Sequence, residues 1–357
     1  DPGQAHLLVR NGSSWIEPSA NPSTFGPVEP IEDAAGLQDV AGKLVLTVKV
    51  TASPQSIGNA MVSTVSLSTS DGINWSGPGA APGAVAAAVQ GPPGADAVGV
   101  LGSSWVAAGN AGTQGKDGPA VGWTSTDASH WSSPVALDPQ PGVLAESAAA
   151  VCTGSSVAVV VGAAAQPRSG TSAAAWYSAG GSRWKHASIG SSSAGGALEW
   201  MDGCTPTGSG FAAYGATAPS GSLTPALWTS ADGTHWTLQG SDTFSHGAPA
   251  PITSVAASGT RWIAVAGTDP DGSSSGANSS LTGFYGAALV YPPSASGIAV
   301  WMSGDGGSSW QRVDTGDAVW EAAAGASLEK SGFVGSTAVV AGVDDGRLQV
   351  WTGTPAL

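Results

Sequence analysis

The chain has 357 residues, with 11 Lys and Arg against 25 Asp and Glu, so its net charge is −14. This charge, without any basic cluster, excludes nucleic acid and anionic membranes as expected partners. Fifty-three Gly and 24 Pro, with only 10% charged residues, favour many tight turns between short strands, and no helical period is visible. The most apolar run, 157–165, is far shorter than the roughly 20 residues of a membrane helix, so no transmembrane segment is expected in the mature chain.

Short strands joined by a tryptophan-closed turn recur from the N-terminus onward. The clearest copy, ALWTSADGTHW at 226–236, combines a strand, a turn containing Asp232 and Gly233, and Trp236 at the start of the returning strand. Asp accepts hydrogen bonds from backbone N–H groups ahead of it, and Gly adopts a positive φ without strain. The related segments are, in chain order, VRNGSSW (9–15), SLSTSDGINW (66–75), GWTSTDASHW (122–131), AWYSAGGSRW (175–184) and VWMSGDGGSSW (300–310).

The tryptophans that close these turns are separated by 60, 56, 53, 52 and 74 residues. Repeats of this length are typical of propeller blades or solenoid turns. The motif S-x-D-x-G-x-x-W resembles the Asp box (BNR repeat) of sialidases, sortilin-type receptors, xyloglucanase-type glycosidases and photosystem assembly propellers. The matching acids are Asp71, Asp127 and Asp232, with Asp305 in a turn one residue longer. The resemblance implies a propeller whose boxes are structural turns on the face opposite an active site.

Each repeat is predicted to have four strands, with the box between the third and the fourth. Hairpins of first and second strands are expected at 40–50, 97–108, 148–161, 201–214, 252–266 and 322–343. No box follows Trp351, whereas the weak box at Trp15 stands alone at the start, so the N-terminal segment is expected to complete the last blade. We predict one all-β domain over 1–357, a six-bladed β-propeller with head-to-tail closure; the alternative has seven blades.

Cys152 and Cys204, the only cysteines, occupy matched places in successive repeats, VCTGSS and GCTPTGSG. Matched positions in adjacent blades are neighbours, which predicts a disulfide in an oxidising compartment; two buried thiols are the alternative.

The chain begins DPGQ, and its Ala/Gly/Ser-rich usage is similar to that of high-GC bacteria. We therefore expect a monomer that is secreted, or anchored as a lipoprotein at the outer face of a bacterial cell envelope.

Several kinds of catalytic and metal site are not supported by the sequence. A sialidase needs an arginine triad and a tyrosine nucleophile with its carboxylate, and the six arginines do not gather. The segment GSSSG at 272–276 lacks the strand and helix of a nucleophile elbow. The acids of DPDG at 269–272 lack the later ligands of a calcium loop, and the five histidines are scattered. We expect no metal and no cofactor.

Two tryptophans outside the repeat pattern, Trp200 and Trp320, suggest a binding site. Each has a neighbouring glutamate where a loop enters a first strand, and an aromatic face beside an acid suits a sugar ring or a cation. Core packing of both rings and a solvated acidic rim are the alternatives. The predicted binding residues are Glu146, Glu199, Trp200, Asp202, Tyr285, Tyr291, Trp320 and Glu321.

These residues predict a scaffold that presents an acidic, aromatic mouth to a glycan or a protein partner. A glycoside hydrolase or lyase that uses paired carboxylates at this mouth is the alternative, because such enzymes need two acids about 5 to 10 Å apart. A structural assembly factor is a third possibility, and it would show a broad apolar patch.

Overall fold

A computed structural model describes residues 9–11, 14–16, 31–40, 43–51, 62–72, 75–79, 91–111, 119–165, 170–190, 198–218, 224–239, 244, 251–266, 298–313, 327–344 and 347–353. These residues form sheets whose strand pairs are antiparallel apart from two short parallel pairs, and they contain no helix, as predicted. The chain divides into two compact units. The first unit comprises Asp1–Ala88, Ala256–Pro270 and Ser296–Leu357, and the second comprises Val89–Val255 and Asp271–Ala295.

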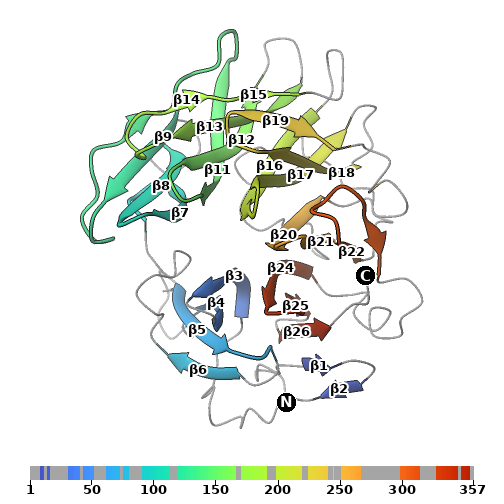
Figure 1. Ribbon diagram of the computed structural model, residues 1–357. Helices are drawn as coiled ribbons and strands as arrows, with labels where there is room; N and C mark the ends of the chain where they lie inside the picture. The colour runs from blue at the N-terminus through green and yellow to red at the C-terminus, as the bar shows by residue number, and fades with distance from the viewer. Residues whose placement is uncertain are drawn as a thin grey trace. The chain divides into compact units, whose positions relative to one another are not determined.

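The second unit contains three meanders, in each of which consecutive strands are hydrogen-bonded neighbours (Figure 1). The second and third meanders are joined into one nine-stranded sheet by a short parallel pairing of Thr171 with Leu198, and each meander is called a sheet below. One has the strands β7 (Ala95–Leu101), β8 (Ser104–Asn110), β9 (Ala120–Ser125) and β10 (Val135–Ala136). The next has β11 (Ala145–Thr153), β12 (Ala158–Ala165), β13 (Thr171–Ser178) and β14 (Lys185–His186). The last has β16 (Leu198–Thr207), β17 (Gly210–Ala218), β18 (Thr224–Ser230) and β19 (His235–Leu238), to which β15 (Ser188–Ile189) adds in parallel.

The first unit contains sheets of the same kind. One is four-stranded, with β3 (Ile31–Val40), β4 (Lys43–Thr51), β5 (Val62–Thr69) and β6 (Trp75–Gly79). Another has β21 (Arg261–Ala266), β22 (Ala299–Ser303) and β23 (Gln311–Arg312), preceded by β20 (Ile252–Ser258), which crosses the boundary between the units. The last is three-stranded, with β24 (Ser327–Val334), β25 (Thr337–Asp344) and β26 (Arg347–Gly353).

The N-terminal hairpin does not extend the last sheet in the way the sequence predicted. Strand β1 (Val9–Asn11) pairs with β2 (Ser14–Ile16) in a separate two-stranded sheet. Its Cα atoms nevertheless lie within 8 Å of those of β26. Within the described residues, β1 therefore lies near β26, but no hydrogen-bonded ladder joins the two strands, and the last sheet has no fourth strand.

The first strand of most sheets contains a β-bulge at an equivalent position. At each bulge the pairing register shifts once, so that the first strand has one residue without a partner on the second strand. These extra residues are Asp96 on β7, Ala149 on β11, Asp202 on β16 and Glu329 on β24. A glycine on the second strand faces the residue before each bulge, as Gly162 faces Ala148 and Gly215 faces Met201. A Cβ on Gly162 would lie 1.9 Å from the carbonyl oxygen of Ser147. Glycine is therefore required where the bulged strand approaches its neighbour.

Three of the tryptophan-closed turns, those of Asp127, Asp232 and Asp305, are held by a serine and an aspartate two residues apart. In the turn after β9, the Ser125 hydroxyl oxygen accepts from the N–H of Ala128 at 3.0 Å, and Asp127 Oδ1 accepts from the N–H of His130 at 2.8 Å. The turns at Asp232 and Asp305 repeat this pattern. Hydrogen bonds from the Ser309 side chain and backbone lower the pKa of Asp305 to about 2. The acceptor capacity of these acids is therefore used within their own turns.

Tryptophans fill the space between successive sheets of the second unit. Trp176 and Trp184 lie in the cluster shared by the sheets β7–β10 and β11–β14, and Trp228 and Trp236 in the cluster shared with β16–β19. A Cβ on Gly122 would lie 2.6 Å from Trp184 Nε1, so this indole rests directly on the third strand of the preceding sheet. All of these rings are buried, and their role is to join neighbouring sheets.

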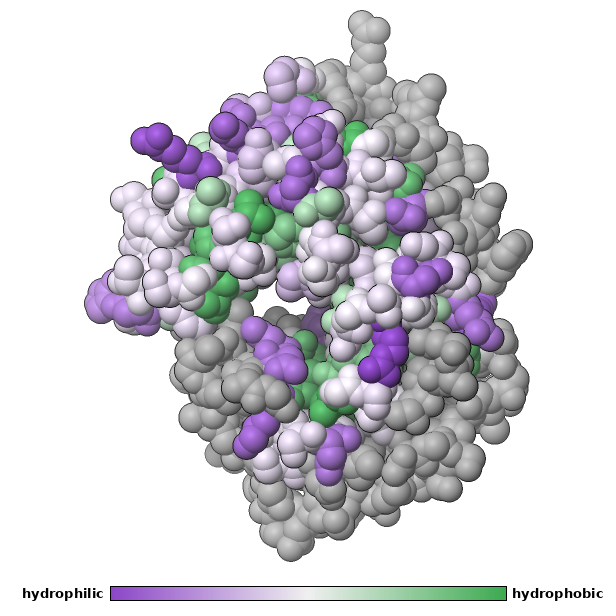
Figure 2. Space-filling model, in the orientation of Figure 1, coloured by the Kyte–Doolittle hydropathy of each residue, from purple (hydrophilic) through white to green (hydrophobic). Residues whose placement is uncertain are grey.

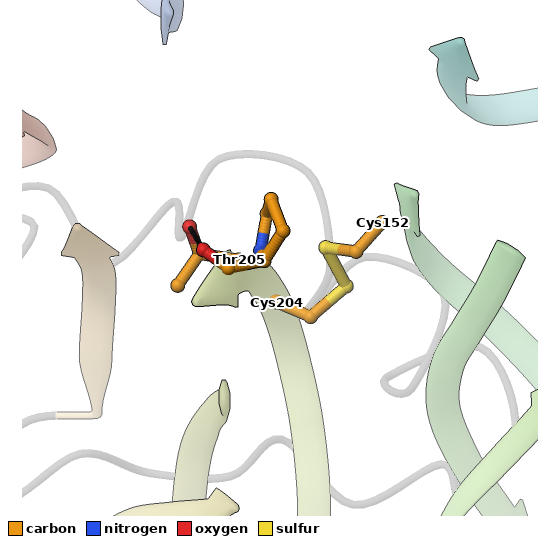
Figure 3. Close-up of a disulfide and its surroundings, with 4 residues drawn as sticks. Cys152, Cys204 and Thr205 are labelled. Carbon is orange, nitrogen blue, oxygen red and sulfur yellow. Dashed lines mark hydrogen bonds between the residues drawn. A yellow bond between two sulfur atoms is a disulfide. The ribbon is translucent and has the colours of Figure 1, made fainter. Parts of the chain in front are cut away.

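The predicted disulfide between successive repeats is confirmed. Cys152 of β11 and Cys204 of β16 have an Sγ–Sγ distance of 2.05 Å and a Cα–Cα distance of 5.9 Å (Figure 3). The two cysteines are 52 residues apart, so the bond closes one complete repeat. It also fixes the first strands of two neighbouring sheets to each other, which matters for the acids that those strands carry.

Candidate binding site

Four of the predicted site residues lie together on the two strands that the disulfide joins. Glu146 is on β11, whereas Glu199, Trp200 and Asp202 are on β16, and these strands are neighbours. Trp320, Glu321, Tyr285 and Tyr291 lie outside the described residues. The structure thus places the acids of two successive repeats on neighbouring strands of the second unit.

Trp200 does not have the exposed face that a stacking role requires. Its side chain is 1% exposed and packs against Ala163 and Ala216, with the half-buried Leu198 at the edge. Its Nε1 donates a hydrogen bond to Asp202 Oδ2 at 2.9 Å. No sugar or cation can lie on a ring covered in this way. The core alternative therefore fits Trp200, and its predicted contact with a ligand is corrected to an indirect role in holding Asp202.

Trp200→Ala is expected to destabilise the protein by about 3 to 5 kcal/mol, because a buried ring is replaced by a cavity. Trp200→Phe should cost less, since most of the packing remains and only the indole N–H is lost. Urea unfolding followed by circular dichroism measures both changes. A transition midpoint in Trp200→Ala equal to that of the wild type would show that the ring is not part of the core.

Glu146 and Glu199 occupy equivalent positions in the repeat, since each lies three residues before the extra residue of its bulge. Both side chains are buried. Glu146 Oε1 accepts a hydrogen bond from the N–H of Gln140 at 2.8 Å. Burial raises the pKa of Glu146, the Gln140 N–H opposes this, and the negative charge of Asp138 raises the pKa further. Neighbouring strands thus carry glutamates at matched positions, with exposed fractions of 7% at Glu146 and 3% at Glu199.

The bulges themselves carry two further acids with raised pKa values. Burial raises the pKa of Asp202 to about 7, against the lowering effect of the Trp200 N–H. At the equivalent bulge on β7, Asp96 is exposed at its surface. Partial desolvation by the surrounding chain nevertheless raises its pKa to about 6, although Asn110 Nδ2 donates to its Oδ2 at 3.1 Å. Near neutral pH both groups exist partly in the protonated form, which donates as well as accepts hydrogen bonds.

The sequence reasoning missed Tyr214, the cross-strand partner of Gly203. Burial and the negative charge of Asp202 both raise the pKa of its phenol, so the hydroxyl stays protonated over the whole neutral range. Tyr214 differs from its counterparts in the other repeats. Four other described sheets carry smaller residues at the position of Tyr214. Only a known strand register makes that exception visible.

The rest of the described surface contains few other candidate sites. The described residues include no group of three or more His, Cys, Asp and Glu that could hold a metal ion. No described helix could cross a membrane. On the face shown in Figure 2, hydrophilic residues are spread in small groups over a surface of mostly intermediate hydropathy. A separate groove of about 580 Å³ in the second unit is lined by Trp123, Trp131 and three prolines.

No protein-family model matches the chain, and no curated protein matches it in sequence. Solved structures that resemble it include the β-propeller domain of the trilobed protease of Pyrococcus furiosus. The two chains are 7% identical, the match covers 91% of this chain and 82% of that chain, and the TM-score is 0.38. The GH32 β-fructofuranosidase BmSUC1 of Bombyx mori is 13% identical to this chain. The match covers 73% of this chain and 57% of that chain, with a TM-score of 0.36.

A third similar structure is the sucrose-6-phosphate hydrolase of Lactobacillus gasseri, which is 12% identical to this chain. The match covers 74% of this chain and 56% of that chain, with a TM-score of 0.37. Likenesses at TM-scores of this size carry no argument about fold or function.

Proposed function

We propose that the chain is a six-bladed β-propeller of the Asp-box type that binds a glycan through carboxyl groups on its innermost strands. The repeated spacing of the closing tryptophans, the meander sheets and the shared bulge support one repeated blade. In such a blade the first strand is innermost, which assigns Glu146, Glu199 and Asp202 to the central mouth.

The observation that carries this proposal is the matched placement of Glu146 and Glu199 on disulfide-linked strands. Carboxyl groups accept hydrogen bonds from the vicinal hydroxyls of sugars, and a rigid pair can select their spacing. An anionic ligand is disfavoured by the net charge of −14. A protein partner finds less support, because the exposed large hydrophobic side chains among the described residues are Val135 on β10 and Leu144 in the turn before β11, and they form no broad patch.

The disulfide also supports an oxidising compartment. We therefore propose that the protein acts as a monomer, secreted or held at the outer face of a bacterial cell envelope. A glycan is an available ligand in that location. Cell fractionation of the source organism would test this part of the proposal, and recovery of the protein from the cytoplasm would contradict it.

Glu146→Gln and Glu199→Gln are expected to weaken glycan binding by about 10- to 100-fold each, because hydrogen bonds to charged groups contribute about 1.5 to 3 kcal/mol. A glycan array identifies the ligand, and isothermal titration measures the affinities. Asp39→Asn, which neutralises an exposed acid on β3 of the first unit, is the matched control and should bind as the wild type does. Failure of the wild type to bind any glycan would refute the proposed function.

A second candidate function is glycoside hydrolysis by the same pair of glutamates. The direction of the pKa shift at Glu146 favours this candidate, because a raised pKa is what the general acid of a glycosidase needs. In that case Glu146→Gln and Glu199→Gln would abolish the release of chromophore from aryl glycosides while the substrate still binds. Absence of hydrolysis across a panel of α- and β-glycosides would leave binding as the function.

A further inference from the structure

One sheet departs from the others at the residue that follows the bulge. In four described sheets this residue and its cross-strand partner are Ala97 and Ala108, Ala150 and Val161, Lys330 and Ala341, and Gly36 and Thr47. In the sheet β16–β19 they are Gly203 and Tyr214. Among these five pairs, only the pair of Gly203 and Tyr214 has an aromatic residue on the second strand. The other four have a small or β-branched residue there.

The glycine makes room for the tyrosine. A Cβ on Gly203 would lie 2.3 Å from both Cζ and the hydroxyl oxygen of Tyr214. The ring therefore crosses from β17 over the backbone of β16, and its hydroxyl end lies over the first strand. A side chain as small as alanine at position 203 would displace it. The phenol is thus placed by the sequence Asp202-Gly203, in which the acid is the extra residue of the bulge.

The acid beside this hydroxyl is held in turn by Trp200. The indole Nε1 donates to Asp202 Oδ2 at 2.9 Å from a side chain that is 1% exposed. Asp202 and Tyr214 themselves are only partly buried. The packed indole therefore fixes one carboxyl oxygen, and Asp202 lies close enough to Tyr214 for its negative charge to raise the pKa of the phenol.

We propose that Asp202 and Tyr214 form a binding subsite for a neutral sugar unit, in which the carboxyl and phenol groups hydrogen-bond to adjacent hydroxyls and Trp200 is a positioning residue. This subsite deepens the proposed function and rests on it. The strands concerned, LEWMDGCTPT and GFAAYGATA, contain no Lys or Arg. A uronic or sialic acid would bring a carboxylate beside Asp202 without a positive charge from these strands to balance it, so neutral sugars are selected.

The test compares oligosaccharides of neutral hexoses, of uronic acids and of amino sugars by isothermal titration with the complete chain. Wild-type protein should bind the neutral series at least tenfold more tightly than the uronic acid series. Tyr214→Phe, which removes only the hydroxyl, should weaken binding of the neutral series about tenfold, and Asp202→Asn should weaken it by a similar factor. Gly203→Ala removes no polar group and should weaken it as well, because it displaces the ring.

Tyr177→Phe on β13 is the matched control, since it removes a tyrosine hydroxyl from another strand of the same unit; its affinity should stay within twofold of the wild type. Trp200→Phe should shift the pH midpoint of binding upward, because loss of the N–H that favours ionised Asp202 raises the pKa of that group.

Two results would overturn the subsite in different ways. If the wild type binds a neutral glycan but Tyr214→Phe, Asp202→Asn and Gly203→Ala bind it equally well, the subsite is wrong and the proposed function stands. If the wild type binds no oligosaccharide of any class, the proposed function fails and the subsite fails with it. Preference for the amino or uronic acid series would refute the assignment to neutral sugars.

Discussion

Gly162→Ala is expected to lower the free energy of unfolding by about 3 kcal/mol or more. The new methyl group would lie 1.9 Å from the carbonyl oxygen of Ser147, and backbone atoms cannot move aside as the end of a flexible side chain can. Overpacking of this kind commonly costs about 1 to 3 kcal/mol, with higher values where backbone must shift. The bulge of β11, and with it the position of Glu146, should be disturbed. Urea unfolding measures the change.

The control for this substitution is Gly208→Ala in the turn between β16 and β17. No heavy atom lies within 4 Å of the Cβ position at Gly208, so its transition midpoint should change little. Gly215→Ala, at the equivalent position of the next sheet, should resemble Gly162→Ala, because its Cβ would lie 2.2 Å from the carbonyl oxygen of Trp200. Equal stability of all three variants would show that the bulges do not require glycine.

Reduction of the disulfide is expected to lower the free energy of unfolding by about 4 kcal/mol. Cys152 and Cys204 close a loop with a sequence separation of 52 residues, and the chain-entropy model assigns about this stabilisation to a loop of that length. Urea unfolding with and without dithiothreitol measures the effect directly, at a single protein concentration and pH.

The variant that carries both Cys152→Ala and Cys204→Ala separates the bond itself from other effects of the reductant. Its stability should match that of the reduced wild type approximately and should not respond to dithiothreitol. An oxidised wild type that unfolds at the same urea concentration as this variant would show that the disulfide contributes nothing to the folded state.

Features that depend on local sequence could be predicted. The serine and aspartate of a turn, as at Ser230 and Asp232, satisfy backbone N–H groups within four residues, so the short motif contains all the partners. The disulfide was predictable because the repeats place Cys152 and Cys204 at matched points. The burial of Trp176 and Trp228 likewise follows from their repeated position on third strands.

Features that depend on register and on contacts between strands were not predictable. Trp200 lies outside the tryptophan repeat, which suggested exposure, but its ring packs against Ala163 of β12 and Ala216 of β17. Gly203 and Tyr214 are separated in the sequence, and only the pairing of β16 with β17 shows that the glycine accommodates the phenol. The position of β1 was predicted only in part, because sequence indicates neighbours more readily than hydrogen-bond ladders.

The most direct measurement is a crystal structure of the protein with the neutral oligosaccharide that binds most tightly. We expect six sheets around one axis, with sugar hydroxyls hydrogen-bonded to Asp202 and Tyr214 and within reach of Glu146 and Glu199. A ligand seated instead in the groove of Trp123 and Trp131, or sheets that do not surround a common axis, would contradict the proposal.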